Sequence, residues 1–202
     1  MIASVSGILA ERNGDTIVIR TDGGVGYAIT VPLGVFERLP APGNRVSLHT
    51  ELVVREDGWF LFGFDQPAER AVFQQLLGAS GFGPRLALAL LSTLGPGRTV
   101  RSIRQRDIAA LSSVSGIGKK KAERLILELY DKFKDLESGP VAEATPAGPG
   151  EEAVRGLVRL GYTQVQSEEA VRGALADGAA QDTAQLMRRA LQGIAATRGG
   201  SR

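Results

Sequence analysis

Two short segments combine glycines and cations at a spacing that suits phosphate binding. "SGFGPR" occupies residues 80–85, and "SGIGKK" repeats its order of serine, glycine, apolar residue and glycine at residues 115–120. Glycine opens turn conformations closed to other residues and lets a phosphate approach the backbone. A helix that begins directly after such a turn adds unpaired N–H groups and a partial positive charge. The pattern therefore predicts two sites for phosphate groups.

The second segment is not a nucleotide-binding loop. That motif requires G-x-x-x-x-G-K-[ST], whereas the residue five before Gly118 is Ser113, and Lys119 is followed by Lys120. A single copy would fit an ordinary connection between two helices, but two copies with the same order favour phosphate binding. Because such contacts hold a nucleic-acid backbone without reading its bases, we expect little sequence preference.

The expected phosphate contacts comprise both loops and the cations that follow them. Phe82 and Ile117, the apolar residues between the glycines, would pack beneath the loops, and Lys121 would only be solvated. The candidate phosphate-binding residues are Ser80, Gly81, Gly83, Arg85, Ser115, Gly116, Gly118, Lys119, Lys120 and Arg124.

The loops belong to a segment with helical periodicity, residues 65–136. "PAERAVFQQLLG", "PRLALALLSTLG", "VRSIRQRDIAALSSV" and "KKKAERLILELYDKF" repeat apolar residues every three or four positions. Residues 65–137 carry 12 Lys/Arg against 8 Asp/Glu, whereas residues 1–64 carry 5 against 7. A basic region around the glycine loops is the electrostatic footprint of a nucleic-acid binder.

Residues 1–64 read as five or so short strands, including 16–21, 27–31, 46–54 and 59–64. This spacing predicts a small barrel, for which an OB-like barrel is a good candidate. In "VVREDGWF", Asp57-Gly58 is a preferred two-residue hairpin turn, which leaves Glu56 solvated. Trp59 and Phe60 are expected in the barrel core rather than as a platform for stacked bases.

The remaining chain divides into a linker and a small helical unit. Residues 137–149 are rich in proline and glycine, which predicts a flexible, fairly extended linker. Residues 150–202 contain three short helical patterns, predicting a three-helix bundle that serves as a binding module. Most of its apolar side chains must form the core, and any outside it would dock a partner; the candidates are Leu157, Leu160, Tyr162, Leu186 and Leu191.

Several segments together resemble one known family. "SGFGPRLALALLS" and "SGIGKKKAERLILEL" look like paired helix-hairpin-helix motifs, and "MIASVSGIL" and "LVVREDGWFLFGF" precede them. They are similar to the RuvA family, the Holliday-junction-binding subunits of bacterial branch migration machines. The resemblance implies an OB-like domain, a double-hairpin domain and a tethered, UBA-like third domain. Arg85 departs from this pattern, because the family often has lysine there.

The resemblance also implies partners and roles. The expected function is to bind four-way junction DNA as a homotetramer and hold it open, in recombination, DNA repair and the SOS response to DNA damage. The third domain would engage the hexameric RuvB ATPase, and the RuvC junction resolvase is a further candidate partner. Glu56 and Asp57 would form an acidic pin that faces the junction centre and repels phosphates.

The composition narrows the remaining possibilities. The chain has no cysteine, and its single histidine, His49, has no companion residue with which to bind a metal. No run of apolar residues is long enough to predict a membrane-spanning helix. No catalytic set is recognisable either, so we expect a cytoplasmic, non-catalytic protein without cofactor or metal.

Two other classes remain open. A helix-hairpin-helix DNA-repair enzyme would need a catalytic carboxylate, for which Asp131 and Asp135 are available, although both fit the polar face of a helix. A general single-strand DNA-binding protein would need exposed aromatic residues along a basic groove.

Overall fold

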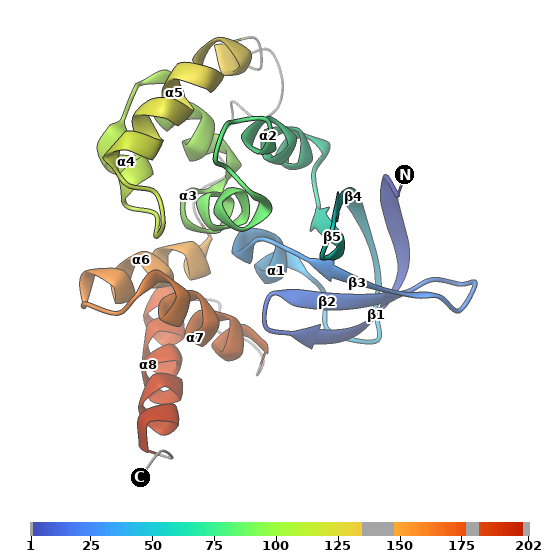
Figure 1. The fold of residues 1–202 in the computed structure, drawn as a ribbon. Helices are drawn as coiled ribbons and strands as arrows, with labels where there is room; N and C mark the ends of the chain where they lie inside the picture. The colour runs from blue at the N-terminus through green and yellow to red at the C-terminus, as the bar shows by residue number, and fades with distance from the viewer. Residues whose placement is uncertain (1, 135–147, 177–181, 200–202) are drawn as a thin grey trace.

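The computed structural model describes residues 2–134, 148–176 and 182–199. It comprises a β-barrel, a central helical domain and a smaller third domain of three helices (Figure 1). The barrel contains β1 (Ser4–Asn13), β2 (Thr16–Arg20), β3 (Gly26–Thr30), β4 (Arg45–Arg55) and β5 (Gly58–Phe64), with α1 (Leu33–Arg38) between β3 and β4.

The five strands close into a barrel in the order β1-β2-β3-β5-β4. Neighbouring strands pair antiparallel except β3 and β5, which meet in parallel at Thr30 and Phe62. β1 completes the closure because it pairs with β2 through its second half and with β4 through its first half. The closed five-stranded barrel with its helix before β4 confirms the OB-like prediction.

The barrel interior follows from the alternation of side chains along each strand. Leu9, Ile17, Ile19 and Ile29 are fully buried, whereas their sequence neighbours are partly or fully exposed. Successive side chains on a strand point to opposite faces, so one face of each strand supplies the core. The β-branched and apolar residues that predicted the strands therefore also fill the barrel.

The central domain is helical, as the sequence predicts. Its helices are α2 (Pro67–Leu77), α3 (Pro84–Arg104), α4 (Ile108–Ser112) and α5 (Lys119–Lys134). The predicted pattern at residues 100–114 is not one helix: it is divided between the end of α3 and α4. Pro67 and Pro84 occupy the first turn of their helices, where a missing N–H costs nothing. α3 is kinked at Gly95, whose φ is +68°, directly before Pro96.

The end of β5 belongs to the hydrophobic core of the central domain, which is separate from the core inside the barrel. The rings of Phe62 and Phe64 on β5 each lie with their centroids 5.0 Å from that of Phe73 on α2. Aromatic pairs at this distance stabilise packing beyond the area that they bury. The β4–β5 hairpin is thereby fixed relative to the helices that carry the glycine loops.

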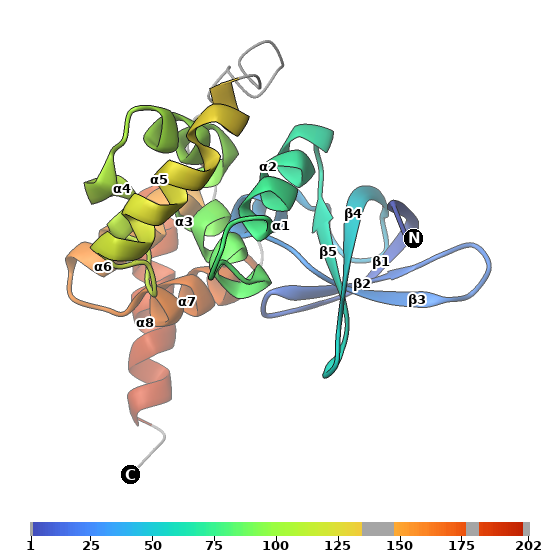
Figure 2. The same ribbon diagram turned by 45° about the horizontal axis from the view of Figure 1, so that its top comes forward.

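The third domain consists of α6 (Pro149–Arg159), α7 (Gln164–Ala176) and α8 (Thr183–Gly199). These three helices confirm the predicted bundle. Of the predicted linker, residues 137–147 lie outside the described residues, and Pro149 already belongs to α6. The domain packs against α1 and α3 rather than standing apart (Figures 1 and 2). No sequence pattern predicted this contact.

Candidate nucleic-acid interface

The two glycine loops have the same backbone geometry. Gly81 has φ +79° and Gly116 has φ +84°, a region that favours glycine. The N–H of Phe82 donates to the Ala79 carbonyl at 3.1 Å, and the N–H of Ile117 donates to the Val114 carbonyl at 3.0 Å. The sequence repeat is therefore a structural repeat, with matching turns at positions 35 residues apart.

The apolar residue of each loop anchors it to the domain core. Phe82 and Ile117 are buried in the hydrophobic core of the central domain, to which the end of β5 belongs. Because these side chains point inward, the backbone of each loop is held at the surface. This confirms the prediction that the apolar residues pack beneath the loops.

Gly118, unlike Gly116, has no structural reason within the chain to be glycine. Its φ is not positive, and a Cβ added there would meet nothing within 4 Å. A Cβ at Gly116 would in contrast lie 2.9 Å from Leu86 Cδ2, on the first turn of α3. A glycine with open space at a helix start allows a phosphate to approach the backbone closely.

The two loops lie side by side and join the barrel hairpin. The contact between Gly116 and Leu86 places the second loop against the helix that follows the first. The Arg55 guanidinium, at the end of β4, lies 3.1 Å from the position that a Cβ of Gly83 would occupy. Sequence reasoning missed Arg55, because nothing local to it shows that it reaches a loop 28 residues away. The hairpin and both loops therefore form one continuous surface.

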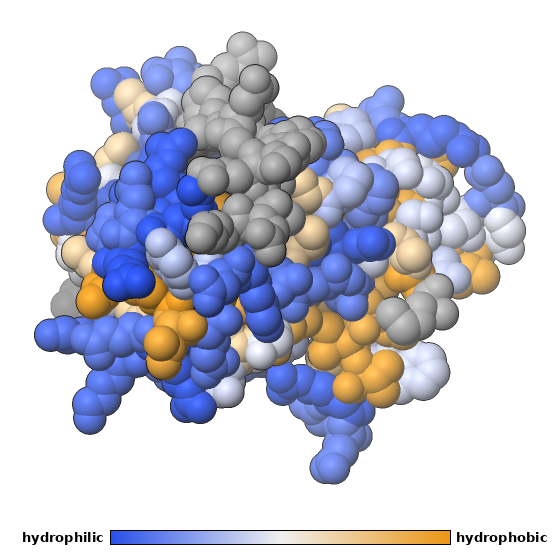
Figure 3. Space-filling model, turned by 90° about the horizontal axis from the view of Figure 1, so that it is seen from above, coloured by the Kyte–Doolittle hydropathy of each residue, from blue (hydrophilic) through white to orange (hydrophobic). Residues whose placement is uncertain are grey.

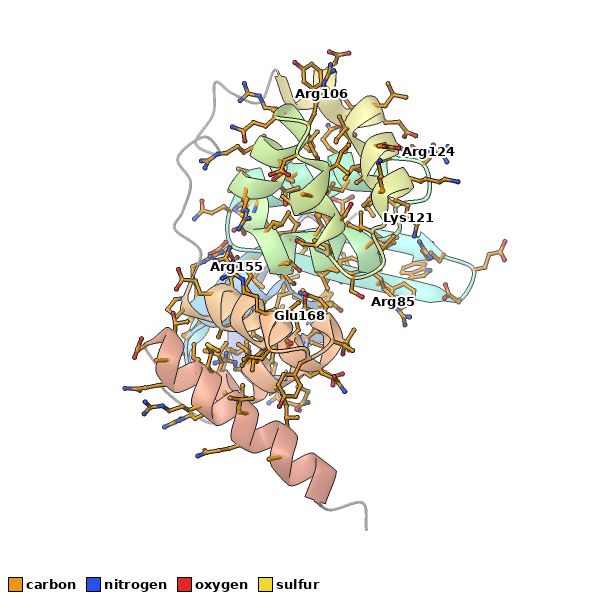
Figure 4. All side chains as sticks on the ribbon, turned by 90° about the vertical axis from the view of Figure 1, so that its left-hand side faces the viewer. Arg85, Arg106, Lys121, Arg124, Arg155 and Glu168 are labelled. Atoms are coloured by element: carbon orange, nitrogen blue, oxygen red, sulfur yellow. The ribbon has the colours of Figure 1, made fainter. Side chains whose placement is uncertain are left out.

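The cations of this surface have different environments. Arg85, Lys119 and Lys120 are exposed on the first turns of α3 and α5. Lys121, predicted to be merely solvated, instead donates from Nζ to the Gly116 carbonyl at 3.0 Å and so stabilises the second loop. Figure 4 shows Arg85, Lys121 and Arg124 along one side of the helical domain.

Glu128 connects the two hairpins. Its Oε2 accepts a hydrogen bond from the Ser80 N–H at 2.8 Å, and its Oε1 accepts one from Arg124 Nε at 2.9 Å. The Ser80 N–H and then the Arg124 guanidinium hold the pKa of the Glu128 carboxyl below its ordinary value. Of the predicted phosphate contacts, the Ser80 N–H and Arg124 thus already have protein partners.

The acidic residues lie at the tip of the β4–β5 hairpin, which extends beyond the barrel (Figure 2). Glu56 and Asp57 are both exposed and form the two-residue turn itself. The predicted Asp57-Gly58 turn is wrong by one residue, because Gly58 pairs with Arg55 in the ladder. The register of the ladder, set by core pairs such as Leu52 with Leu61, decides where the turn closes.

The prediction that Trp59 and Phe60 belong to the barrel core is wrong. Trp59 is 75% exposed and pairs across the hairpin with exposed Val54, and Phe60 is 40% exposed. The strands that carry Trp59 and Phe60 continue past the end of the barrel. Side chains that point to the same face as buried Leu61 therefore have no barrel interior to enter at this end of the hairpin. Apolar surface is gathered in patches on the face that Figure 3 shows.

Within residues 2–134, 148–176 and 182–199, no group of three or more His, Asp or Glu side chains could hold a metal ion. Asp131 is exposed on α5, and Asp135 lies outside the described residues. In the part of the chain that the structure describes, no helix is long and apolar enough to cross a membrane.

The third domain separates the predicted partner contacts into core and surface. Leu157 and Leu186 are fully buried in its core, and Tyr162 and Leu191 are partly buried against it. Leu160, at the end of α6, is 61% exposed. Val165 near the start of α7, which sequence reasoning missed, is 59% exposed. These two exposed apolar residues are called the α6–α7 patch below.

Comparison with known proteins identifies related chains for all three parts. Residues 1–63 match the family described as RuvA N terminal domain, residues 73–131 the SAM-like helix-hairpin-helix tandem, and residues 148–195 the RuvA C-terminal domain. A protein of Gemmatimonas aurantiaca named Holliday junction branch migration complex subunit RuvA is 46% identical over 97% of this chain and 100% of its own length. The protein of the same name from Pseudomonas putida KT2440 is 40% identical over 96% of this chain and 98% of its own.

Proposed function

The chain belongs to the RuvA family, and from this premise we propose that it is the DNA-binding subunit of a Holliday junction branch migration complex. It binds four-way junction DNA and performs no catalysis itself. Branch migration costs energy. Because this chain performs no catalysis, a partner must hydrolyse the ATP that drives migration.

The observation that carries this proposal is the pairing of two loops with equal geometry on one surface. Each loop ends at a helix start with exposed cations beside it. Backbone N–H groups at helix starts bind phosphate without reading bases. Two such sites, linked through Glu128 and Leu86, suit neighbouring phosphates of a DNA backbone. The surface thus favours recognition of DNA shape over recognition of sequence.

The hairpin tip gives the surface its preference for a junction. Glu56 and Asp57 carry negative charge at the tip of a hairpin, and Arg55, directly before this turn, contacts the first loop. Carboxylates there repel phosphates that come close, whereas the loops attract them. In an assembly of several copies around a four-way junction, the tips keep strands apart at the centre.

The partners follow from the same assignment. We propose a homotetramer around the junction, the RuvB ATPase as the motor and the RuvC resolvase as a further partner. The α6–α7 patch, Leu160 and Val165, is the surface of the third domain that supports motor binding, because it is apolar and exposed.

A general single-strand DNA-binding function is the second candidate, favoured by the exposure of Trp59 and Phe60. Aromatic residues on a surface that also carries cations can stack on unpaired bases. The barrel itself has more acidic than basic residues, which weighs against it as an independent single-strand site.

A mobility-shift competition with the full chain distinguishes the two candidates. Labelled four-way junction is competed with unlabelled junction, duplex and single strand of matched length. We expect the unlabelled junction to compete far better than the other two. Equal competition by all three DNAs would contradict the proposal, and preference for single strand would support the second candidate.

A further inference from the structure

Trp59 presents the largest exposed apolar side chain of the β4–β5 hairpin, close behind its acidic tip. The side chain is 75% exposed, and its partner across the ladder, Val54, is 59% exposed. The barrel interior ends before this pair, so both side chains stand open among the residues that the structure describes. Contiguous exposed apolar surface marks a site of interaction. Trp59 and Val54, called the indole surface below, therefore indicate a binding site.

The alternation of side chains along the ladder gives the hairpin two different faces. Arg55 and Val53 belong to the face that lies against the central domain, where Arg55 reaches the first glycine loop and Val53 packs on the domain core. Trp59 shares the opposite face with Leu61, whose side chain belongs to the barrel core. One face of the hairpin therefore joins the proposed phosphate sites, while the other presents the indole.

The charges beside the indole surface exclude part of what a nucleic acid could offer. Glu56 and Asp57 form the turn between the strands that carry Val54 and Trp59, and both are exposed. Their carboxylates repel phosphate groups. The flat, neutral face of a base is the part of DNA that fits beside them. Stacking of one base on an aromatic side chain raises affinity by about fivefold to a hundredfold.

A second copy of this chain fits the indole surface less well than a base does. If two copies met through this surface, their acidic tips would come together as well, and the carboxylates would repel one another. The hairpin is also continuous with the surface proposed to bind DNA, because Arg55, directly before the tip, contacts the first loop at Gly83. DNA held by the loops therefore passes the hairpin that carries the indole.

We propose that Trp59, supported by Val54, is a stacking site for an unpaired base at the centre of the junction. Bases inside a duplex arm are covered on both faces by their neighbours. A face becomes free only where strands exchange and pairs open, which costs free energy. The carboxylates of the tip keep the backbones apart, and the indole receives the base that this separation leaves unstacked. The inference deepens the proposed function and rests on it.

Tryptophan fluorescence measures this contact directly, because Trp59 is the only tryptophan in the chain. In the full chain without DNA, we expect the emission of a water-exposed indole that acrylamide quenches freely. Saturation with four-way junction should reduce this emission at least about twofold and slow the quenching by acrylamide, since a stacked base covers the ring. Saturation with duplex of matched length should change the emission much less. Unchanged emission in the junction complex would overturn the proposal.

The same measurement detects a second copy of the chain as the alternative occupant. An interface between copies would give the free chain the emission of a buried indole, with poor quenching by acrylamide. Dilution would then restore the emission of an exposed indole, whereas DNA would leave it unchanged. This combination would overturn the base as the occupant.

A fluorescent base gives the same information from the DNA. 2-Aminopurine emits strongly when unstacked and weakly when stacked, and it is placed once at the crossover and once in the middle of an arm. At the crossover, we expect the complex with Trp59→Ala to emit at least about threefold more than the complex with the unchanged chain, because the opened base has lost its platform. In the arm, the two complexes should emit equally. Equal emission at the crossover would contradict stacking by Trp59.

Two further variants separate stacking from simple apolar contact. Trp59→Phe keeps an aromatic ring and should retain junction affinity within about fivefold, whereas Trp59→Leu keeps only apolar surface and should lose more. Val25→Ala changes another exposed apolar residue, in the turn between β2 and β3, and is the control that should leave affinity unchanged. A Trp59→Leu chain that binds as tightly as the Trp59→Phe chain would show that the ring is not used and overturn the stacking.

The mobility-shift competition keeps this inference separate from the proposed function. A chain that binds the junction no better than duplex would overturn the proposed function and the inference together. A chain that prefers the junction, yet shows the same Trp59 emission free and bound, would overturn the inference alone.

Discussion

Glu128 Oε2 accepts a hydrogen bond from the Ser80 N–H at 2.8 Å, so the helix of the second hairpin holds the loop of the first. This contact spans 48 residues and fixes the spacing between the two proposed phosphate sites. Spacing matters because phosphates along a DNA strand lie at fixed intervals.

Glu128→Ala should weaken junction binding by loosening the first loop. Glu128→Gln is the informative companion, because its amide oxygen can still accept the Ser80 N–H while the negative charge is lost. We expect binding of the Gln variant to equal or exceed that of the unchanged chain, measured by mobility shift. Equal weakening of junction binding by both variants would show that the negative charge of Glu128, rather than its hold on the first loop, controls the affinity.

Gly118→Ala should affect binding more than folding. Since Gly118 has no positive φ and no close neighbour, the free energy of unfolding should fall by no more than about 1 kcal/mol. Junction affinity should fall clearly, because the added Cβ would occupy the space through which we propose that a phosphate approaches. Chemical denaturation and mobility shift measure the two effects.

Gly116→Ala provides the contrast to that variant. Its φ of +84° and the Leu86 side chain 2.9 Å away predict a loss of both stability and binding. Equal stability of the two alanine variants would contradict this reading of the loops.

Lys119→Ala with Lys120→Ala should flatten the salt dependence of junction binding. The logarithm of affinity falls with the logarithm of salt concentration by a slope of about −0.9 per neutralised phosphate. Removing two cations beside the second loop should make the slope less steep. Arg188→Ala with Arg189→Ala removes the same charge from α8 and should leave the slope unchanged. An unaltered slope in the lysine variant would refute phosphate contacts by these residues.

Glu56→Ala with Asp57→Ala should keep junction binding but change the rate of branch migration in the presence of the ATPase. The carboxylates repel phosphates at the tip of an exposed hairpin, so their loss should also strengthen binding to duplex DNA. Stability should hardly change, because both side chains are exposed. Unchanged migration together with unchanged duplex binding would rule out an acidic pin.

The docking of the third domain against α1 and α3, called closing below, should weaken as the pH rises. Burial raises the pKa of both Glu37 and Glu151 to about 7, from ordinary values near 4.5 that release would restore. Closing therefore takes up protons: it is most favourable below about pH 4.5 and is lost as the pH rises through about 7. The charged groups that act on these two carboxyls, besides each other, are Arg38, Arg98, Arg155 and Arg172.

The chain contains no cysteine, so Thr93→Cys introduces a single thiol at a position that is 4% exposed and contacts Gln164 of the third domain. The check on this pH dependence is the labelling rate of that thiol divided by that of a cysteine peptide at the same pH. The ratio should rise between about pH 5 and pH 8. Glu37→Gln with Glu151→Gln should give a ratio that changes less with pH, and Glu168 of α7, whose pKa burial also raises, accounts for the dependence that is left. A flat ratio in the chain that keeps both glutamates would show that neither carboxyl controls closing.

The barrel, the helices and the glycine repeat could be predicted because each depends on neighbours in sequence. Alternation of apolar residues defined the strands, and the Ser-Gly-apolar-Gly order defined both loops. Local sequence preference did not place the hairpin turn correctly. It favoured Asp57-Gly58, but the register of the β4–β5 ladder places the turn at Glu56-Asp57. Trp59 is a second case: it is apolar and lies on a strand, but it is exposed because the barrel interior does not extend to its position.

The sequence by itself therefore determined the three parts of the chain and the chemistry of the loops, namely backbone N–H groups with cations. Only the tertiary structure decided that Arg55 reaches Gly83, that Glu128 holds Ser80 and that Leu33 completes the third domain. The physical reason is that backbone conformation and periodicity follow from a few adjacent residues. Contacts between distant residues depend instead on how whole elements pack, which no single segment encodes.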